Sequence, residues 1–156
     1  MIVSQTFECE LRSIIAYLRR HIPEPYPVID NDELFNDIDN IPPVRLAVML
    51  DNHLPIEFQL GDAGGRFDVF VSITATTRQQ LGALASIAYT TVIQYPTIPL
   101  YTNLTLKGEI ADLTTYAGFL SICREPMPQY RQQVVTAKED RARYSGVLSF
   151  SAIHMQ

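Results

Sequence analysis

The chain has 156 residues, of which 47% are apolar and 19% are charged, and its formal net charge is −5. This length suits a single domain, and the composition is typical of a soluble globular protein. The negative charge argues against a protein that grips a nucleic-acid duplex, which requires a dense basic surface. The longest apolar runs are too short to span a bilayer, and residues 1–22 lack the pattern of a secretory signal, so we expect synthesis in the cytoplasm.

An amphipathic helix is predicted near the N-terminus. Glu8 and Glu10 fall in its first turn, where negative charge complements the helix dipole. Arg19 and Arg20 fall in its last turn and complement the opposite end. Three prolines at alternate positions in residues 23–27 then favour an extended, polyproline-like path rather than a tight turn. The apolar residues that follow helical spacing are Phe7, Leu11, Ile14, Ile15, Leu18 and Ile22.

Residues 28–43 are acidic and rich in turn-forming residues, and we expect a solvated surface loop with a short helical turn. The spacing excludes a calcium-binding loop, because the sixth position counted from Asp30 is not glycine and the twelfth is not glutamate. Phe35 in this segment is expected to tuck under the domain or into a neighbouring subunit.

Alternating apolar runs at residues 44–50 and 56–60 are predicted as strands. The glycine-rich residues 61–65 lead from the second run into a third, so we expect an antiparallel hairpin with a mobile tip. A phosphate-binding role for Gly64 and Gly65 is disfavoured, because no Gly-Lys-Ser/Thr follows and the loop leads into a strand.

The central unit of the chain is predicted to be a strand at residues 66–74 followed directly by a helix from Arg78 to Ile93. Strict alternation places Phe67, Val69, Val71 and Ile73 on one face of the strand. Thr76 or Thr77 is a suitable N-cap for the helix. The apolar helix positions are Leu81, Leu84, Ala85, Ala88, Val92 and Ile93.

The C-terminal part is predicted to consist of strands, although Leu113, Tyr116, Ala117 and Leu120 also fit the spacing of a helix. Residues 95–99 are expected to break the chain, and strands are predicted within residues 100–110 and 116–123, where Thr, Tyr and Phe dominate. Residues 131–136 and 143–153 are predicted to form a closing β-hairpin with serines on its outward face. The whole chain is therefore expected to be one α+β domain, with a mostly antiparallel sheet and two main helices packed on one face.

No residues show the spacing of a catalytic, cofactor or metal site. The three histidines have no histidine or cysteine at metal-ligand spacing, and Cys9 and Cys123 are expected to be buried thiols rather than a disulfide. No Gly-x-Ser-x-Gly elbow is present. The uncharged serine and threonine residues at the expected strand edges favour oligomerisation through sheet contacts.

Three segments together resemble a known family. These are the strand Phe67-x-Val69-x-Val71-x-Ile73-x-Ala75, the helix Arg78-x-x-Leu81-x-x-Leu84-Ala85, and the late strand Arg143-Tyr144-Ser145-Gly146-Val147-Leu148-Ser149-Phe150. With the N-terminal helix, this order of elements resembles the tail-terminator and tail-completion (neck) proteins of tailed bacteriophages.

The resemblance implies a structural protein of the virion, located at the tail and neck, and neither an enzyme nor a cofactor-binding protein. It implies a homo-hexameric ring that caps the tail tube, contacts a sheath protein if one exists, and joins the neck or stopper protein. DNA would pass through the lumen without sequence-specific binding, and no membrane is involved. The candidate residues for contacts with neighbouring subunits or the tube are Phe35, Asp62, Gly64, Gly65, Arg66, Asp68, Arg141 and Arg143.

Two alternatives remain open from the sequence. A head–tail stopper or adaptor shares the small ring design of virion neck proteins. A cellular α+β domain that binds a small molecule or catalyses a reaction would instead have a deep pocket with converging polar groups.

Overall fold

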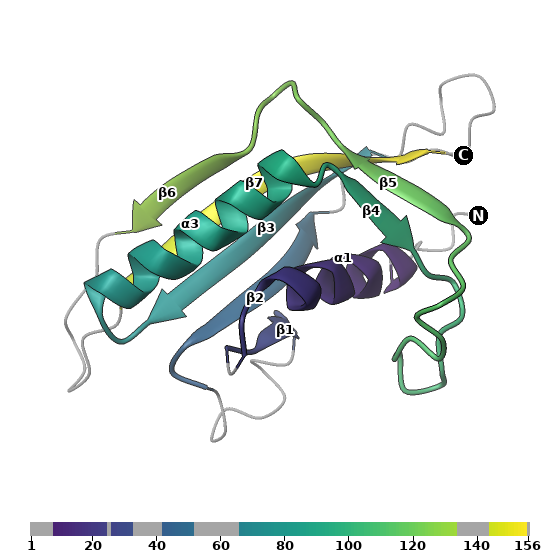
Figure 1. The fold of residues 1–156 in the computed structure, drawn as a ribbon, viewed down its shortest axis with the longest axis horizontal. Coiled ribbons are helices and arrows are strands. Elements are labelled where there is room, and N and C mark those ends of the chain that lie inside the picture. The colour runs from purple at the N-terminus through teal and green to yellow at the C-terminus, as the bar shows by residue number, and fades with distance from the viewer. Residues whose placement is uncertain (1–7, 25, 33–41, 52–65, 134–143, 156) are drawn as a thin grey trace.

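The computed structural model describes residues 8–24, 26–32, 42–51, 66–133 and 144–155. Within these residues the chain forms two helices and seven strands, which follow one another as shown in Figure 1. Their bounds are α1 Glu8–His21, β1 Val28–Asp30, β2 Arg45–Asp51, β3 Arg66–Ala75, α3 Arg78–Gln94, β4 Thr97–Leu100, β5 Gly118–Ile122, β6 Gln129–Gln133 and β7 Tyr144–Met155.

All of these strands belong to one sheet, in the order β1-β2-β3-β7-β5-β4. β6 pairs with the first half of β7, beside the segment of β7 that pairs with β5. Only β1 and β2 run parallel, and every other pairing in the described sheet is antiparallel. Both helices cross the same face of the sheet (Figure 1). The predicted α+β fold with a mostly antiparallel sheet and two helices on one face is therefore confirmed.

The core lies between this sheet face and the two helices. In β3, Phe67, Val69, Val71 and Ile73 are each at most 1% exposed, as their alternation predicts. β7 contributes Leu148, which faces Val71 across the ladder and is fully buried. The predicted faces of both central strands are confirmed.

The helix α3 begins where the sequence predicts. Thr77 is the N-cap, and its side chain accepts a hydrogen bond from the backbone N–H of Gln80. Leu81, Leu84 and Val92 are buried against the sheet, but Ile93 is 41% exposed, so its predicted place in the core is wrong. At 100° per residue, Ile93 falls on the flank of the stripe that Leu81 and Leu84 define.

The N-terminal helix α1 also packs as predicted, with Ile14, Ile15 and Leu18 buried. The segment after it differs from the prediction. Tyr26 donates a backbone hydrogen bond to Pro23, which makes a turn rather than an extended path. Residues 28–30, expected in a surface loop, form the strand β1, because pairing with β2 buries Val28.

The two strands predicted at residues 44–50 and 56–60 have different outcomes. Residues 45–51 form β2, as expected from their alternation. The run at 56–60 lies outside the described residues, and β2 itself pairs with β3 at residues 68–74, where the predicted hairpin placed 56–60. The partner of β3 is therefore β2, which precedes it by a longer connection, and not the run at 56–60, which is nearer in sequence.

The segment that was expected to break the chain forms the strand β4. Pro99 lies within β4, where it lacks an N–H for a ladder, but β4 is the last strand of the sheet and needs donors on one side only. Residues 118–122 form β5 as predicted, whereas residues 101–117 hold one isolated bridge, between Leu104 and Ile110, instead of a strand.

The predicted C-terminal hairpin is confirmed, since β6 pairs with β7 in antiparallel register. The inference that the serines of β7 mark an exposed edge is wrong. β7 pairs with β3 on one side and with β6 and β5 on the other, so it is an interior strand. Ser151 is 4% exposed and donates a hydrogen bond to Asp68 at 2.5 Å. Among the described strands, the free edges belong to β1, β4 and β6.

Ser13 ties α1 to the segment after β4. It is fully buried, its hydroxyl donates to the carbonyl of Cys9, and it accepts a hydrogen bond from the backbone N–H of Tyr101 at 2.8 Å. Tyr101 is 3% exposed, so water cannot easily replace this partner.

Ser13→Ala is therefore expected to lower the free energy of unfolding by about 1–3 kcal/mol, because it leaves the buried N–H of Tyr101 without an acceptor. Denaturant unfolding of the purified variant measures this loss. Ser86→Ala, at an exposed position of α3, is the matched control and is expected to change stability by about 0.5 kcal/mol or less. Equal effects at the two positions would contradict a structural role for the Ser13 hydroxyl.

Candidate functional site

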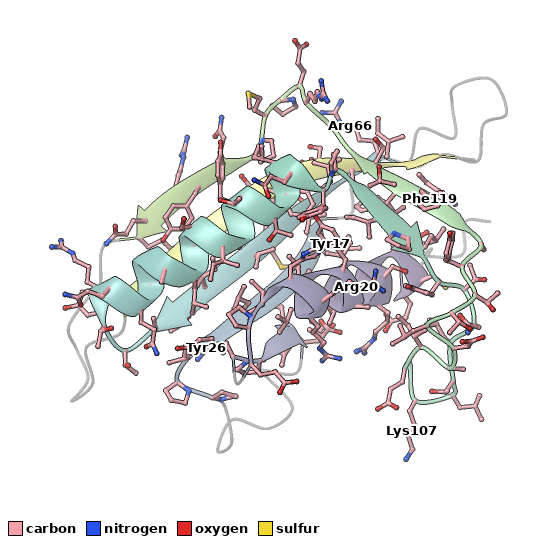
Figure 2. The ribbon with its side chains drawn as sticks, viewed as in Figure 1. Tyr17, Arg20, Tyr26, Arg66, Lys107 and Phe119 are labelled. Carbon is pink, nitrogen blue, oxygen red and sulfur yellow. The ribbon has the colours of Figure 1, made fainter. Side chains whose placement is uncertain are left out.

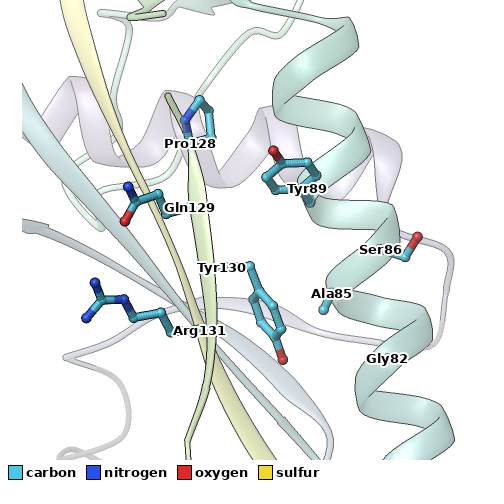
Figure 3. Close-up of a pocket in the computed structure, with 8 residues that line it drawn as sticks. All are labelled: Gly82, Ala85, Ser86, Tyr89, Pro128, Gln129, Tyr130 and Arg131. Carbon is cyan, nitrogen blue, oxygen red and sulfur yellow. The ribbon is translucent and has the colours of Figure 1, made fainter. Parts of the chain in front are cut away.

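A groove lies between α3 and the edge strand β6 (Figure 3), with a cavity volume of about 550 Å³. It is open to solvent along its length. Four residues of α3 line one side, and the start of β6 with the preceding proline lines the other. The lining residues are Gly82, Ala85, Ser86, Tyr89, Pro128, Gln129, Tyr130 and Arg131.

Small residues on α3 create the space. A Cβ atom built on Gly82 would meet nothing within 4 Å, so this side of the helix faces an unfilled volume. Ala85, about one turn further along the helix, also has a small side chain and leaves space in the groove. The structure places this side of the helix, with its small side chains, along β6.

Tyr130 fills part of the space between the two elements. Its ring passes directly over Gly146 of β7, and a Cβ atom at Gly146 would come within 2.1 Å of the Tyr130 hydroxyl. Glycine is needed at this position because of that close approach. The Tyr130 hydroxyl is buried and has no hydrogen-bond partner among the described residues. Burial also raises the pKa of Tyr130, so the phenol stays protonated and keeps a proton to donate.

The outer edge of β6 is open. Within the described sheet β6 pairs only with β7, and every second residue of an antiparallel strand points its N–H and C=O away from its partner. Tyr130 projects into the groove, whereas Gln129 and Arg131 project from the opposite side of the strand (Figure 3). The groove and the open edge together offer backbone hydrogen bonds and a place for side chains, which is how an added strand is recognised.

Two of the predicted contact residues lie elsewhere, at the start of β3. Arg66 and Asp68 are half-buried near the Cys123 thiol, and Asp68 is held by Ser151. Asp68 was expected to be a surface or interface charge, and it takes part instead in this hydrogen bond. It still lines a small hollow of about 160 Å³ that also includes Gln129 of β6.

The remaining predicted contact residues, Phe35, Asp62, Gly64, Gly65, Arg141 and Arg143, lie outside the described residues. The groove itself was not predicted. Its signals in the sequence were present but separate: small residues on a predicted helix, and a glutamine-rich strand around Tyr130 that contains no acidic residue. Only the tertiary structure places the two side by side.

The described residues contain no cluster of metal-holding side chains and no activated thiol. No group of three His, Cys, Asp or Glu side chains that could hold a metal ion occurs among them. Cys9 and Cys123 are free thiols, and burial raises the pKa of both, which disfavours the reactive thiolate. Neither described helix has the length and apolar character of a membrane span.

The fold and the groove define an α+β protein in which a groove lies beside an open edge of the described sheet. Comparison with known proteins found no family model and no curated protein that matches the sequence.

Proposed function

We propose that this chain is a structural virion protein that assembles into a closed hexameric ring, caps the tail tube of a tailed bacteriophage and joins the tube to the head–tail neck. The observation that carries the proposal is that β1 and β6, two of the three free strand edges of the described sheet, lie on opposite sides of its central strands β2, β3 and β7. Two different edges on one subunit suit head-to-tail contacts, which generate rings when the rotation closes. The resemblance of β3, α3 and β7 to tail-terminator proteins supplies the family.

The arrangement of the helices supports the same function. Both helices cover one face of the sheet, and the opposite face carries the half-exposed Phe70 and Met49, which is 45% exposed. A subunit with two unlike edges and two unlike faces can bind the last ring of a tube on one side and offer no equivalent surface on the other. Growth of the tube then stops at this subunit. The tube, sheath and neck proteins are its proposed partners.

The proposal is tested by particle size and by a polymerisation assay. Sedimentation at micromolar concentration and negative-stain images are expected to show annular particles of six copies. Adding these rings to a polymerising tail-tube protein is expected to shorten the tubes and to place one ring at one tube end. A strictly monomeric profile at micromolar concentration, together with unchanged tube lengths, would overturn the proposal.

A further inference from the structure

Two of the free edges of the described sheet, β1 and β6, lie at the same height along the strand direction. Asp30 of β1 pairs with Val48, Val48 pairs with Val71, Val71 pairs with Leu148, and Leu148 pairs with Tyr130, so one transverse row runs from β1 to β6. One parallel pairing and three antiparallel pairings separate the two strands along this row, so β6 runs antiparallel to β1. If copies are placed side by side with the same orientation, the β1 side of one copy meets the β6 edge of the next at the same height, in antiparallel sense.

The β1 strand itself offers little to a neighbour. It has three residues, and the carbonyl of Val28 already accepts a hydrogen bond from Arg19. The carboxylate of Asp30 also has partners within its own subunit. It lies 3.6 Å from the guanidinium of Arg12 and accepts a hydrogen bond from the backbone N–H of Asp32. On this side, the residues that follow Asp30 in the sequence are therefore the ones available for a contact with the next copy. Asp30 itself is level with Tyr130 of that copy.

Charge separates the two sides. α3 and β6 contain no acidic residue, and their charged residues are Arg78 and Arg131. Arg131 is exposed, and no ion pair joins it to another described residue. In contrast, the sequence after β1 is strongly acidic, with Asp32, Glu33, Asp37 and Asp39 within eight residues. Opposite charges on the two sides favour a head-to-tail contact and oppose contacts between like sides.

Alternation in the acidic segment divides its side chains between the two sides of β6. In an extended segment, alternate side chains point to opposite faces. Leu34, Asn36 and Ile38 would share the face toward the groove together with Asp32, and on this side α3 leaves space and the Tyr130 hydroxyl has no hydrogen-bond partner among the described residues. Glu33, Phe35, Asp37 and Asp39 would share the other face, on which Arg131 projects, so three of the four acidic side chains of the segment would lie on the side of Arg131.

We propose that the groove between α3 and β6 is the docking site for the acidic segment 32–39 of a second copy of this chain, which adds to the edge of β6 as an extra strand. The inference rests on the proposed ring and names the contact that closes it. Backbone hydrogen bonds to β6 hold the segment, Leu34 and Ile38 enter the groove, and the carboxylates of Glu33, Asp37 and Asp39 lie on the side of Arg131. Each subunit gives its acidic segment to one neighbour and receives that of the other.

A charge exchange between two variants tests this contact. Arg131→Glu alone, and Asp37→Lys with Asp39→Lys alone, each place like charges at the contact and are expected to raise the concentration for half-assembly roughly tenfold or more. A mixture of the two variants has only attractive contacts when the copies alternate around the ring. The mixture is therefore expected to recover rings of the original size, which an even-numbered ring permits.

A charge reversal outside the contact is the control. Lys107 lies in the loop of residues 101–117, far from β6 in the same view (Figure 2), and is exposed. Lys107→Glu changes the net charge as Arg131→Glu does and is expected to leave assembly unchanged. Normal assembly of the Arg131→Glu variant, or failure of the mixture to assemble, would overturn the docking site.

Filling the groove gives a second test that does not depend on charge. Gly82→Trp projects a ring into the open volume and is expected to block assembly, whereas Gly82→Ala leaves most of the volume free and is expected to permit it. The alanine variant should also raise the thermal midpoint, because alanine is the better helix former. Normal rings from the tryptophan variant would overturn the inference.

The outcomes distinguish this contact from the proposed function. If the wild-type chain forms rings that cap tubes and none of the groove variants affects them, the docking site is wrong and the function stands. If the wild-type chain forms no ring, the synthetic peptide of residues 31–41 is titrated into the monomer. Saturable binding that Arg131→Glu weakens would support the site without the ring, and absence of binding would overturn both.

Discussion

Phe67→Ala is expected to lower the free energy of unfolding by about 3–5 kcal/mol, the range for removing a large aromatic side chain from a core. Phe67 is 1% exposed and lies on the helix-facing side of β3, opposite Ala152 of β7. The alanine cannot fill the volume vacated by the ring, and the surrounding strands are fixed by ladders on both sides, so the cavity collapses only in part. Denaturant unfolding of the variant against the wild type gives the difference.

Phe70→Ala in the same strand is the matched control. Phe70 has the same side chain, but it points to the face without helices and is partly exposed. Its loss is expected to be clearly smaller than that of Phe67, because less apolar area is removed from the interior. Comparable losses at the two positions would mean that the face of β3 opposite the helices is covered as completely as the core.

Leu84→Ala is expected to cost about 2–5 kcal/mol. Leu84 is 1% exposed and lies in the buried stripe of α3, which packs on β3 and β7. Because this stripe packs α3 on the sheet, the loss should appear both in the unfolding midpoint and in faster hydrogen exchange along the helix. The exchange measurement separates a local loosening of α3 from a uniform loss.

The control for Leu84 is an apolar residue of the same helix that the sequence also assigned to the core. Ile93 is 41% exposed, and Ile93→Ala in the monomer is expected to change stability by about 0.5 kcal/mol or less. A large loss from Ile93→Ala at concentrations where the chain is monomeric would show that the end of α3 is more deeply packed than its exposure indicates.

The sequence was sufficient for elements whose pattern and packing agree. The alternation of β3 and the helical spacing of α1 and α3 each place apolar residues on one face, and burying that face is what stabilises the element. The N-cap at Thr77 was predictable for a related reason, because a hydroxyl that satisfies a backbone N–H acts within one turn. The α+β class follows from the order of these elements.

The predictions failed where a distant segment decides the outcome. Residues 28–30 are too few to show a period, and they form β1 only because β2 supplies hydrogen bonds. Pro99 is a strong break signal, and a strand forms there because β4 lies at the sheet edge and needs no donor on its outer side. The nearby run at 56–60 was the natural partner for β3 in the sequence, and β2 occupies that position.

The candidate site was beyond prediction for the same reason. The sequence by itself determined which residues of each central strand and helix face inward, because burial of apolar side chains is a local periodic signal. The tertiary structure alone decided which edges stay unpaired, and that the small residues of α3 lie beside Tyr130. Strand order depends on which set of long-range pairings buries the most surface in total. That total cannot be read from the pattern of any single segment.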